Sequence, residues 1–458
     1  MSKEFLTTKR IDDVYRPIDV RKQDYLEVER TLSAEEIHQQ SARCMTCGIP
    51  FCHGTGCPLC NFIPEINEAV HKGNDREAYE LLNATNSMPE FTSRICPALC
   101  EGSCTASLGT DSVMIRQIEK QVVEKAFENG WVNREGPKQR SGKSVAVVGS
   151  GPAGLAAAIA LNQSGHRVSV YERNPDFGGL LRYGIPSFKL DKKIIDRRIQ
   201  LMRDTGIEFQ ANTEIGKDIS MDYLARQFDA VVIAAGTPTA RPLDIPGSDL
   251  QGIFFALDFL NGNVSAEGRN VLVIGGGDTG SDCVGLSVRQ GAKSILQIEI
   301  MPEPPAERSA STPWPLWPYK QRTSSSHKEG GERRWNLQST RCLGSNGHVT
   351  GVEVQRVEWS FSPEGRPMSF TAVENTTEVL RADIVFLAMG FLKPKYDIKE
   401  KNVFIMGDAA NGPSLVVRAM NDANKAVESI NCFLMSGSFQ KWTGVVFKSG
   451  LSRKTDKP

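Results

Sequence analysis

The chain has 458 residues, of which 40% are hydrophobic and 24% are charged, and its formal net charge is zero. This length predicts about three domains of roughly 150 residues each, and the balanced charge gives no reason to expect a nucleic acid or an anionic membrane as a partner. No stretch approaches the ~20 apolar residues of a membrane span, and the first residues, MSKEFLTTKRIDDVYRP, lack the apolar core of a secretion signal. We therefore expect a cytoplasmic protein, in which structural disulfides are uncommon.

The first part of the chain is predicted to be a helical region that carries most of the cysteines. Eight of the eleven cysteines fall between Cys44 and Cys104. Ser33 can cap a helix with Glu36 as its capping-box partner, and residues 64–86 and 112–130 have the apolar spacing of helices. The residue pattern up to this point predicts no β-strand, and the polar, turn-rich stretch 133–143 is typical of a linker.

Two later segments, 144–173 and 270–300, follow the order strand, glycine-rich turn, helix, strand. In such a turn the first glycine permits a tight bend, the second lets the backbone approach a pyrophosphate, and the third allows the helix to pack on the strand. An acidic residue about 20 positions later can hydrogen-bond a ribose hydroxyl. The matching residues are Gly149, Gly151, Gly154 and Glu172 in the first segment and Gly275, Gly277, Gly280 and Glu299 in the second. The pattern predicts two dinucleotide-binding domains, with turns that bind nothing as the alternative.

Two nucleotide sites in one chain suggest that one nucleotide delivers a hydride and a bound flavin receives it. Late in the chain, VFIMGDAA resembles the second flavin motif of flavoproteins with two such domains. In that motif an aspartate, here Asp408 after Gly407, meets the ribityl chain; a plain helix cap is the alternative role for Asp408. A flavin can release its electrons singly, so one-electron carriers such as iron–sulfur clusters are expected beside it.

The spacing of the eight clustered cysteines favours 4Fe–4S clusters over zinc. One structural zinc could take Cys44, Cys47, Cys57 and Cys60, which form two CxxC pairs. That site would leave the other four cysteines unexplained. Separations of two to four residues, with a proline after Cys57 and after Cys96, are more typical of 4Fe–4S ligation.

Several motifs together resemble the small (β) subunit of glutamate synthase. They include RCMTCGIPFCHGTGCPL, PEFTSRICPALCEGSC, VVGSGPAGLAAA, FGGLLRYGIPSFKL, VIGGGDTGSDCVG, EIMPEPPAERS and GPSLVVRAM, and the likeness runs from about residue 3 to residue 436. The resemblance implies an oxidoreductase of the α/β class, with a helical double 4Fe–4S domain followed by two Rossmann-like domains. It implies that NAD(P)H reduces FAD, and that electrons pass through two 4Fe–4S clusters to a large (α) subunit, which makes glutamate from glutamine and 2-oxoglutarate. A related NAD(P)H oxidoreductase with a ferredoxin-type acceptor and a non-enzymatic zinc scaffold are the alternatives.

The resemblance also implies the site residues and the domain boundaries. One cluster would use Cys44, Cys47, Cys52 and Cys104, and the other Cys57, Cys96, Cys100 and Glu119. The matching motifs add Pro152, Ala153, Arg173, Gly179, Leu180, Asp278, Thr279 and Val417 to the expected cofactor-binding residues, while Lys189 is expected near the flavin. The expected domains are 1–143 for the clusters, 144–245 with 391–436 for FAD, and 246–390 for NAD(P)H, followed by a tail over 437–458. No catalytic acid or base is expected, because hydride passes directly between the rings.

The chain departs from the family pattern at three places. Cys60 stands where relatives carry a non-cysteine residue, so either it or Glu119 is the eighth cluster ligand. Ile300 and Met301 occupy positions where NADPH-using relatives often carry two arginines, which together with Glu299 makes NADH a candidate. The alternative is that an arginine elsewhere binds the 2′-phosphate of NADPH, and the candidates are Arg308, Arg322, Arg333 and Arg334. The segment before Gly407 is also shorter than in relatives.

Overall fold

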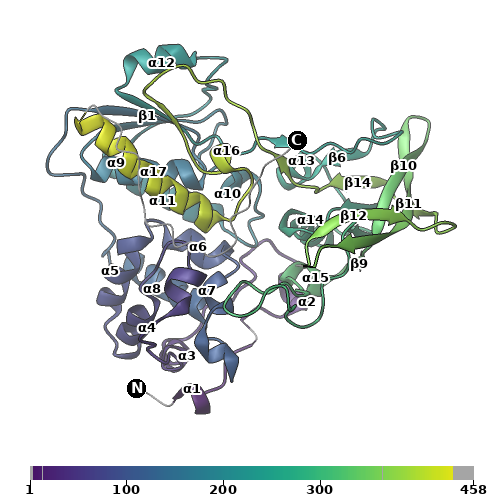
Figure 1. The fold of residues 1–458 in the computed structure, drawn as a ribbon, viewed down its shortest axis with the longest axis horizontal. Helices are drawn as coiled ribbons and strands as arrows, with labels where there is room; N and C mark the ends of the chain where they lie inside the picture. Colours follow the sequence, from purple (N-terminus) through teal and green to yellow (C-terminus); the bar gives the residue numbers. More distant parts are fainter. Residues whose placement is uncertain (1–3, 13, 364, 437–458) are drawn as a thin grey trace.

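The structure, a computed structural model, describes residues 4–12, 14–363 and 365–436, so the expected tail over 437–458 lies outside the described residues. A helical region comes first and is followed by two α/β regions, each built on a five-stranded parallel sheet (Figure 1). The expected fold class is therefore confirmed. None of the helices in the described ranges is long and apolar enough to cross a membrane.

The helical region begins as the sequence predicts, with Ser33 and Glu36 forming a complete capping box. The helical spacing over 64–86 belongs to two helices, because the chain turns at Gly73, whose φ of +76° suits glycine. Apart from one isolated bridge between Tyr15 and Glu29, the described part of this region contains no strand pairing. Its elements are α1 (Glu4–Thr7), α2 (Ile18–Arg21), α3 (Ala34–Ser41), the π-helix η1 (Cys52–Gly56), α4 (Ile63–His71), α5 (Asp75–Thr85), α6 (Pro89–Ile95), α7 (Leu99–Gly102), the 3₁₀ helix η2 (Thr105–Leu108) and α8 (Ile115–Glu128).

The first α/β region has the strand order β16-β4-β1-β2-β3, in which every pair is parallel. Its central helix, α9, is buried along most of its length and packs against the late helix α17. The strands are β1 (Ser144–Val148), β2 (Arg167–Tyr171), β3 (Glu208–Gln210), β4 (Ala230–Ile233) and β16 (Val403–Ile405). The helices are α9 (Pro152–Gln163), α10 (Leu180–Tyr183), α11 (Lys192–Asp204), α12 (Met221–Gln227), α16 (Asp408–Asn411) and α17 (Val416–Ser436).

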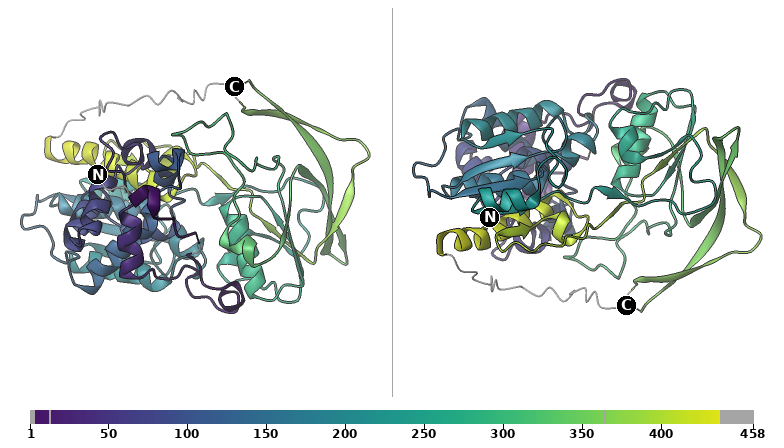
Figure 2. Two further views of the ribbon diagram at one scale, coloured as in Figure 1. Left: turned by 90° about the horizontal axis from the view of Figure 1, so that it is seen from below. Right: turned by 90° about the horizontal axis from the view of Figure 1, so that it is seen from above.

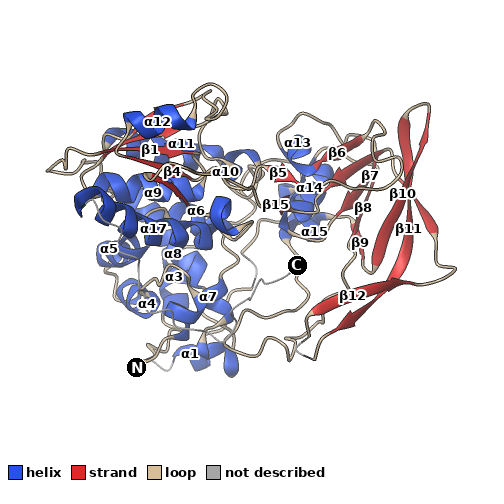
Figure 3. Cartoon of the chain, turned by 45° about the horizontal axis from the view of Figure 1, so that its top comes forward, coloured by secondary structure: helices blue, strands red, loops and turns tan. Residues whose placement is uncertain are grey.

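The second α/β region repeats this plan with the order β6-β14-β7-β8-β9 and adds an antiparallel sheet at its outer edge (Figure 3). The parallel strands are β6 (Ile253–Phe255), β7 (Asn270–Ile274), β8 (Ser294–Ile298), β9 (Glu332–Arg334) and β14 (Ile384–Leu387). The antiparallel strands are β10 (Leu337–Ser345), β11 (His348–Phe361), β12 (Pro367–Ala372) and β13 (Glu378–Arg381). The helices are α13 (Ala256–Leu260), α14 (Asp278–Arg289) and α15 (Ser325–Glu329).

The helical region packs closely on the first α/β region, whereas the second α/β region is more separate. The helical region and the first α/β region share one hydrophobic core, and the buried pair of Arg198 and Glu90 links α11 to α6 at 2.8 Å. The second α/β region is built around separate hydrophobic clusters, one of which also includes Val28 and Phe188, and it forms a separate lobe (Figure 2). The chain enters and leaves this lobe along the short strands β5 (Thr239–Ala240) and β15 (Phe391–Leu392), which pair antiparallel.

The N-terminal segment over residues 14–30 ties the second lobe to the rest of the chain. The backbone N–H of Val28 donates to the carbonyl of Phe188 in the first α/β region at 2.8 Å. Arg21 reaches the second lobe, where its Nε lies 2.7 Å from Glu329 on α15. Glu329 also binds Arg289 of α14, and all three of these side chains are at most 2% exposed.

Candidate functional site: two nucleotide-binding turns beside a cysteine-rich helical region

The first glycine-rich turn joins β1 to α9 in a conformation that depends on its glycines. Gly149 has a φ of +103°, and a β-carbon on Gly154 would lie 2.0 Å from the carbonyl oxygen of Gly149. The turn therefore needs glycine at both places. By contrast, a β-carbon on Gly151 would meet no protein atom within 4 Å. The backbone at Gly151 is thus open to a ligand at the N-terminus of α9, as expected for a pyrophosphate site.

The two expected acidic residues have the same arrangement in the two α/β regions. Glu172 follows β2 and accepts the backbone N–H of Ser150, inside the first turn, at 3.1 Å and that of Asn174 at 3.0 Å. Glu299 follows β8 and accepts the N–H of Gly276, inside the second turn, at 2.6 Å and that of Met301 at 3.0 Å. Each carboxylate is therefore fixed against the backbone of its turn, and the sequence predicts that it meets a ribose.

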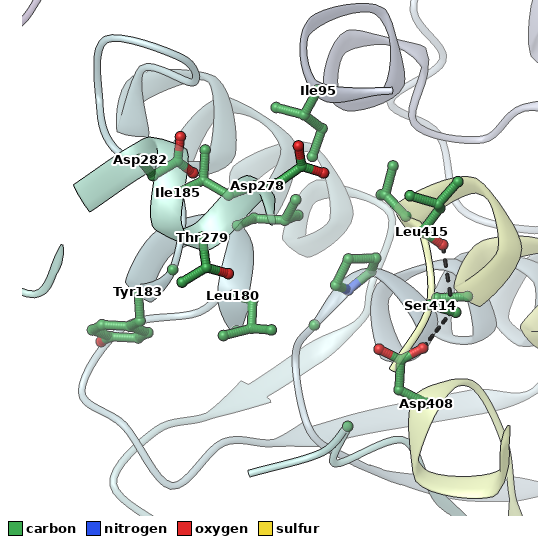
Figure 4. A pocket seen from close by; sticks show the side chains of 18 of the residues that line it. Ile95, Leu180, Tyr183, Ile185, Asp278, Thr279, Asp282, Asp408, Ser414 and Leu415 are labelled. Atoms are coloured by element: carbon green, nitrogen blue, oxygen red, sulfur yellow. Dashed lines mark hydrogen bonds between the residues drawn. The ribbon is translucent and has the colours of Figure 1, made fainter. Parts of the chain in front are cut away.

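Asp408 lies at the carboxyl end of the first sheet and is not a plain helix cap. The N-cap of α16 is Gly407, and the Asp408 carboxylate instead accepts the hydroxyl of Ser414 at 2.5 Å (Figure 4). Burial raises the pKa of Asp408. A β-carbon on Gly407 would lie 2.6 Å from that of Ala153, so the late Gly-Asp motif packs directly on the first turn. The short segment before it nevertheless completes the sheet through β16.

A single cavity of about 1180 Å³ runs between the two turns. Its wall includes residues of all three regions, among them Cys96 of the helical region, Gly151 of the first turn and Gly277 of the second. Figure 4 shows Asp278, Thr279 and Asp282 of α14 facing the same space as Leu180 and Asp408. The other residues that were expected to bind a cofactor and that line this cavity are Gly149, Pro152, Ala153, Glu172, Arg173 and Gly179. The expected residues that do not line it include Gly154, Gly275, Gly280, Glu299 and Gly407.

Lys189 of the first α/β region and Asp282 of α14 form a salt bridge on the wall of this cavity. Burial lowers the pKa of Lys189, but its charge interaction and hydrogen bond with Asp282, together with the charges of Asp278 and Tyr15, leave that pKa raised. Burial likewise raises the pKa of Asp282. The pair therefore joins the two α/β regions through opposite charges that face the ligand space.

The electrostatic neighbours of the clustered cysteines fall into two groups, which match in membership the two sets that the family resemblance implies; their role as cluster ligands stays a prediction. In the first set, burial and then the neighbouring sulfurs of the other members raise the pKa of Cys52. In the second set, burial and then the Glu119 carboxylate raise the pKa of Cys57 to about 12. The pKa of Cys100 is also raised, by burial and then by Glu119 and the Cys57 and Cys96 sulfurs. We call Cys44, Cys47, Cys52 and Cys104 the first cysteine set, and Cys57, Cys96, Cys100 and Glu119 the second.

The second set surrounds a small cavity that contains Glu119 and excludes Cys60. All four members of the set, together with Asn61, Arg116 and Val417, line this cavity. Glu119 is 7% exposed and accepts the Asn61 amide at 2.8 Å, and burial raises its pKa to about 7. Cys60 is exposed, and its sulfur lies 4.0 Å from the carbonyl of Pro58. The zinc site considered from the sequence would pair Cys57 with Cys60 and with the first set, which is not the grouping in the structure.

The chemistry of both sets fits a cationic metal centre. Buried thiols and a buried carboxylate repel one another as anions, and bound iron would supply the compensating charge. A second sign is Asn67 on α4, which is 1% exposed and whose amide atoms have no hydrogen-bond partner among the described residues. Burial raises the pKa of Cys44, and the nearby polar side chain of Asn67 lowers it. The described residues contain no group of three at the close spacing of a single-ion site.

Some residues of the site could not have been found from motifs. Arg116 lines both cavities, and its backbone and side chain contact Glu101 and Glu29. Asp282 and Ser414 also acquire their roles only through contacts with residues distant in the sequence. Arg116 lies in the same helix as Glu119, which is the one signal that could have drawn attention to it.

Comparisons with known proteins agree with this arrangement. Residues 21–131 match the family described as dihydropyrimidine dehydrogenase domain II, 4Fe-4S cluster, and residues 143–311 match pyridine nucleotide-disulphide oxidoreductase. A solved structure, FprA from Mycobacterium tuberculosis in complex with NADPH, superposes with a TM-score of 0.52 at 19% identity. It covers 63% of this chain and 84% of that one, and supports the fold alone.

The chain also matches curated relatives along nearly its whole length. It is 42% identical to the glutamate synthase [NADPH] small chain of Mycobacterium tuberculosis, covering 92% of this chain and 93% of that one. It is 39% identical to the glutamate synthase [NADPH] small chain of Bacillus subtilis, covering 95% and 98%. It is 41% identical to the glutamate synthase [NADH] of Saccharomyces cerevisiae, covering 95% of this chain and 22% of that one. On these matches, the chain belongs to the glutamate synthase small-chain family.

Proposed function

We propose that this chain is the electron-input subunit of a glutamate synthase. It takes electrons from NAD(P)H and passes them to a large subunit, which forms glutamate from glutamine and 2-oxoglutarate. One observation carries the proposal: Cys96 and Arg116 line both the large cavity between the nucleotide-binding turns and the small cavity of the second cysteine set. A nucleotide site and an electron-carrier site therefore share a wall. The names of the small-chain relatives support the large subunit as partner.

The first α/β region supplies the groups that would hold FAD. Gly151 and the N-terminus of α9 leave space for the pyrophosphate. Glu172 would accept a hydrogen bond from the adenosine ribose, and Asp408 would meet the ribityl chain; both carboxylates are held by protein donors. Arg173, Gly179 and Leu180 complete this side of the wall.

The second α/β region supplies the groups that would hold NAD(P)H. Gly277 would approach the pyrophosphate, since a β-carbon there meets no protein atom within 4 Å. Asp278 and Thr279 begin the helix that follows and face the cavity. Hydride transfer between two stacked rings needs close positioning and the exclusion of water, and the Lys189–Asp282 pair contributes by holding the two regions against each other.

The two cysteine sets would hold one 4Fe–4S cluster each. When bound, FAD accepts an electron pair from NAD(P)H and the clusters carry electrons one at a time. We assign Glu119 as the eighth ligand, because it lies in the small cavity with the other members of its set while Cys60 lies outside. The domains would then be 1–143 for the clusters, 144–245 with 391–436 for FAD, and 246–390 for NAD(P)H.

The proposal is tested on protein purified without oxygen, alone and with the large subunit co-expressed. We expect bound FAD, about eight iron and eight sulfide per chain, and reduction of a dye by a reduced nicotinamide nucleotide without glutamine. With the large subunit present, the same nucleotide should drive glutamate formation from glutamine and 2-oxoglutarate. Protein that lacks both flavin and acid-labile sulfide would refute the proposal. Activity with a ferredoxin but with no large subunit would favour the alternative acceptor.

A further inference from the structure

We propose that this chain takes NADH and rejects NADPH, with Glu299 as the residue that discriminates. The inference deepens the proposed function and rests on it. It concerns one position of the nucleotide, the adenosine 2′ carbon, which carries a hydroxyl in NADH and a phosphate in NADPH. The relatives are named for both nucleotides, so family membership leaves the choice open.

The Glu299 carboxylate is fixed by two backbone donors. It accepts Gly276 N–H at 2.6 Å and Met301 N–H at 3.0 Å. A β-carbon on Gly276 would lie 2.8 Å from the carboxylate, so the contact between the turn and the acid is close. An acid held at this end of the second strand accepts a hydrogen bond from a ribose 2′-hydroxyl and repels a 2′-phosphate.

The first α/β region provides an internal reference for this arrangement. Glu172 accepts N–H groups from Ser150 and Asn174, which occupy the same places relative to the turn and to the acid as Gly276 and Met301 do. That region is proposed to bind FAD, whose adenosine ribose has a free 2′-hydroxyl. The second region repeats the arrangement suited to an unphosphorylated ribose, which is the ribose of NADH.

The arginines near Glu299 are engaged with other protein groups. Arg333, on the strand beside β8, donates to the carbonyl of Arg322 and to the Thr323 hydroxyl, both at 3.0 Å. Arg334 binds Glu378, with one nitrogen–oxygen distance of 3.1 Å.

Arg322 lies over the Trp317 ring and donates to the Pro318 carbonyl at 2.7 Å. The residues directly after Glu299 are Ile300 and Met301, which carry no charge. A 2′-phosphate would thus meet a carboxylate with no arginine aimed at it from these positions.

The test compares the two nucleotides on the purified holoenzyme. A hydrogen bond to a charged group contributes enough to change affinity by about 10- to 100-fold, and repulsion of the phosphate adds to the difference. We expect kcat/KM for flavin reduction to be about 100-fold higher with NADH than with NADPH. Calorimetry gives a readout that is independent of activity: 5′-AMP should bind more tightly than 2′,5′-ADP.

Variants locate the discrimination. Glu299→Gln removes the charge while keeping the shape, and should lower the NADH-to-NADPH ratio at least 10-fold, mainly through a lower KM for NADPH. Glu303→Gln is the matched control, because Glu303 is an acid of the same loop whose carboxylate accepts the Gln321 amide at 2.6 Å and not the backbone N–H of Gly276 in the second turn. It should leave the ratio unchanged.

The outcomes separate this inference from the proposed function. If neither nucleotide reduces the flavin, the proposed function fails. If NADPH is used as well as NADH or better, or if 2′,5′-ADP binds more tightly than 5′-AMP, the function stands and the inference is wrong. Arg333→Ala and Lys320→Ala, at two cationic positions on the cavity wall, would then identify the group that binds the phosphate.

Discussion

Replacing Glu329 by glutamine should weaken the attachment of the second α/β region to the rest of the chain. Glu329 accepts Arg21 Nε of the N-terminal segment at 2.7 Å and Arg289 Nη1 of α14 at 2.5 Å. The side chains of Glu329 and Arg289 are 0% exposed and that of Arg21 is 2% exposed. The variant would leave two buried guanidinium groups without their shared anion.

The expected cost follows from this burial. Removing one partner of a buried ion pair costs about 3–5 kcal/mol. We expect the lower end, because Arg21 and Arg289 also donate to backbone carbonyls that the variant keeps. For a region of roughly 145 residues, the unfolding entropy corresponds to about 0.3 kcal/mol per degree. The transition of the second α/β region should therefore fall by about 10 °C.

Differential scanning calorimetry of the holoprotein measures this shift. Glu267→Gln is the matched control, since Glu267 is an exposed acid of the same region and loses the same charge; its transition should move by less than about 1 °C. Limited proteolysis should also cut residues 14–30 faster in Glu329→Gln than in the control. An unchanged transition in Glu329→Gln would show that these three buried side chains do not stabilise the second α/β region.

Three further predictions concern the cofactor sites and pH. Gly151→Ala should greatly reduce the FAD content of the protein. It should lower the unfolding temperature of the flavin-free protein far less than Gly154→Ala does, because a β-carbon on Gly154 would lie 2.0 Å from a backbone oxygen. A wild-type flavin content in Gly151→Ala would contradict the assignment of Gly151 to the FAD pyrophosphate. Glu119→Ala should lose about half of the bound iron while Cys60→Ser keeps it, as iron and sulfide analysis will show, and the reverse result would make Cys60 the ligand. Burial lowers the pKa of His327 to about 4, below the pKa of ~6.5 of a histidine in the unfolded chain. Between pH values of about 4 and about 6.5 the unfolded chain therefore binds more protons than the folded one, so the folded state loses stability as the pH falls through this range. Between pH 4.5 and 7, the unfolding temperature of His327→Asn should depend less on pH than that of the wild type. An NMR titration of His327 with a midpoint above 6 would refute the lowered pKa of this residue.

Features that depend on neighbours in the chain could be predicted from the sequence. The Ser33–Glu36 capping box and both glycine-rich turns form where their residue patterns place them. The apolar spacing over 64–86 predicts helix on both sides of Gly73, where the structure has α4 and α5, but the spacing alone does not indicate the break that Gly73 makes between them. Backbone torsions and hydrogen bonds between residues three or four apart decide such features, and these are encoded locally.

The site could be predicted only in part. The glycine-rich turns and the acids Glu172 and Glu299 followed from spacing, because a nucleotide contacts a short segment in a fixed order. The sequence left open whether Cys60 or Glu119 is the eighth cluster ligand, in the same set as Cys57, since a thiolate and a carboxylate can both bind iron. The structure separates them: α8 carries Glu119 into the small cavity, while Cys60 faces solvent.

By itself, the sequence determined the class of the fold, the two nucleotide-binding turns and the family to which the chain belongs. Only the tertiary structure decided which distant residues meet: Lys189 with Asp282, Arg21 with Glu329, and Arg198 with Glu90. The physical reason is the range of the interactions. Turns and caps are set by short-range torsions and hydrogen bonds, whereas partners far apart in the chain are chosen by how helices and sheets pack to fill one core and to pair each buried charge.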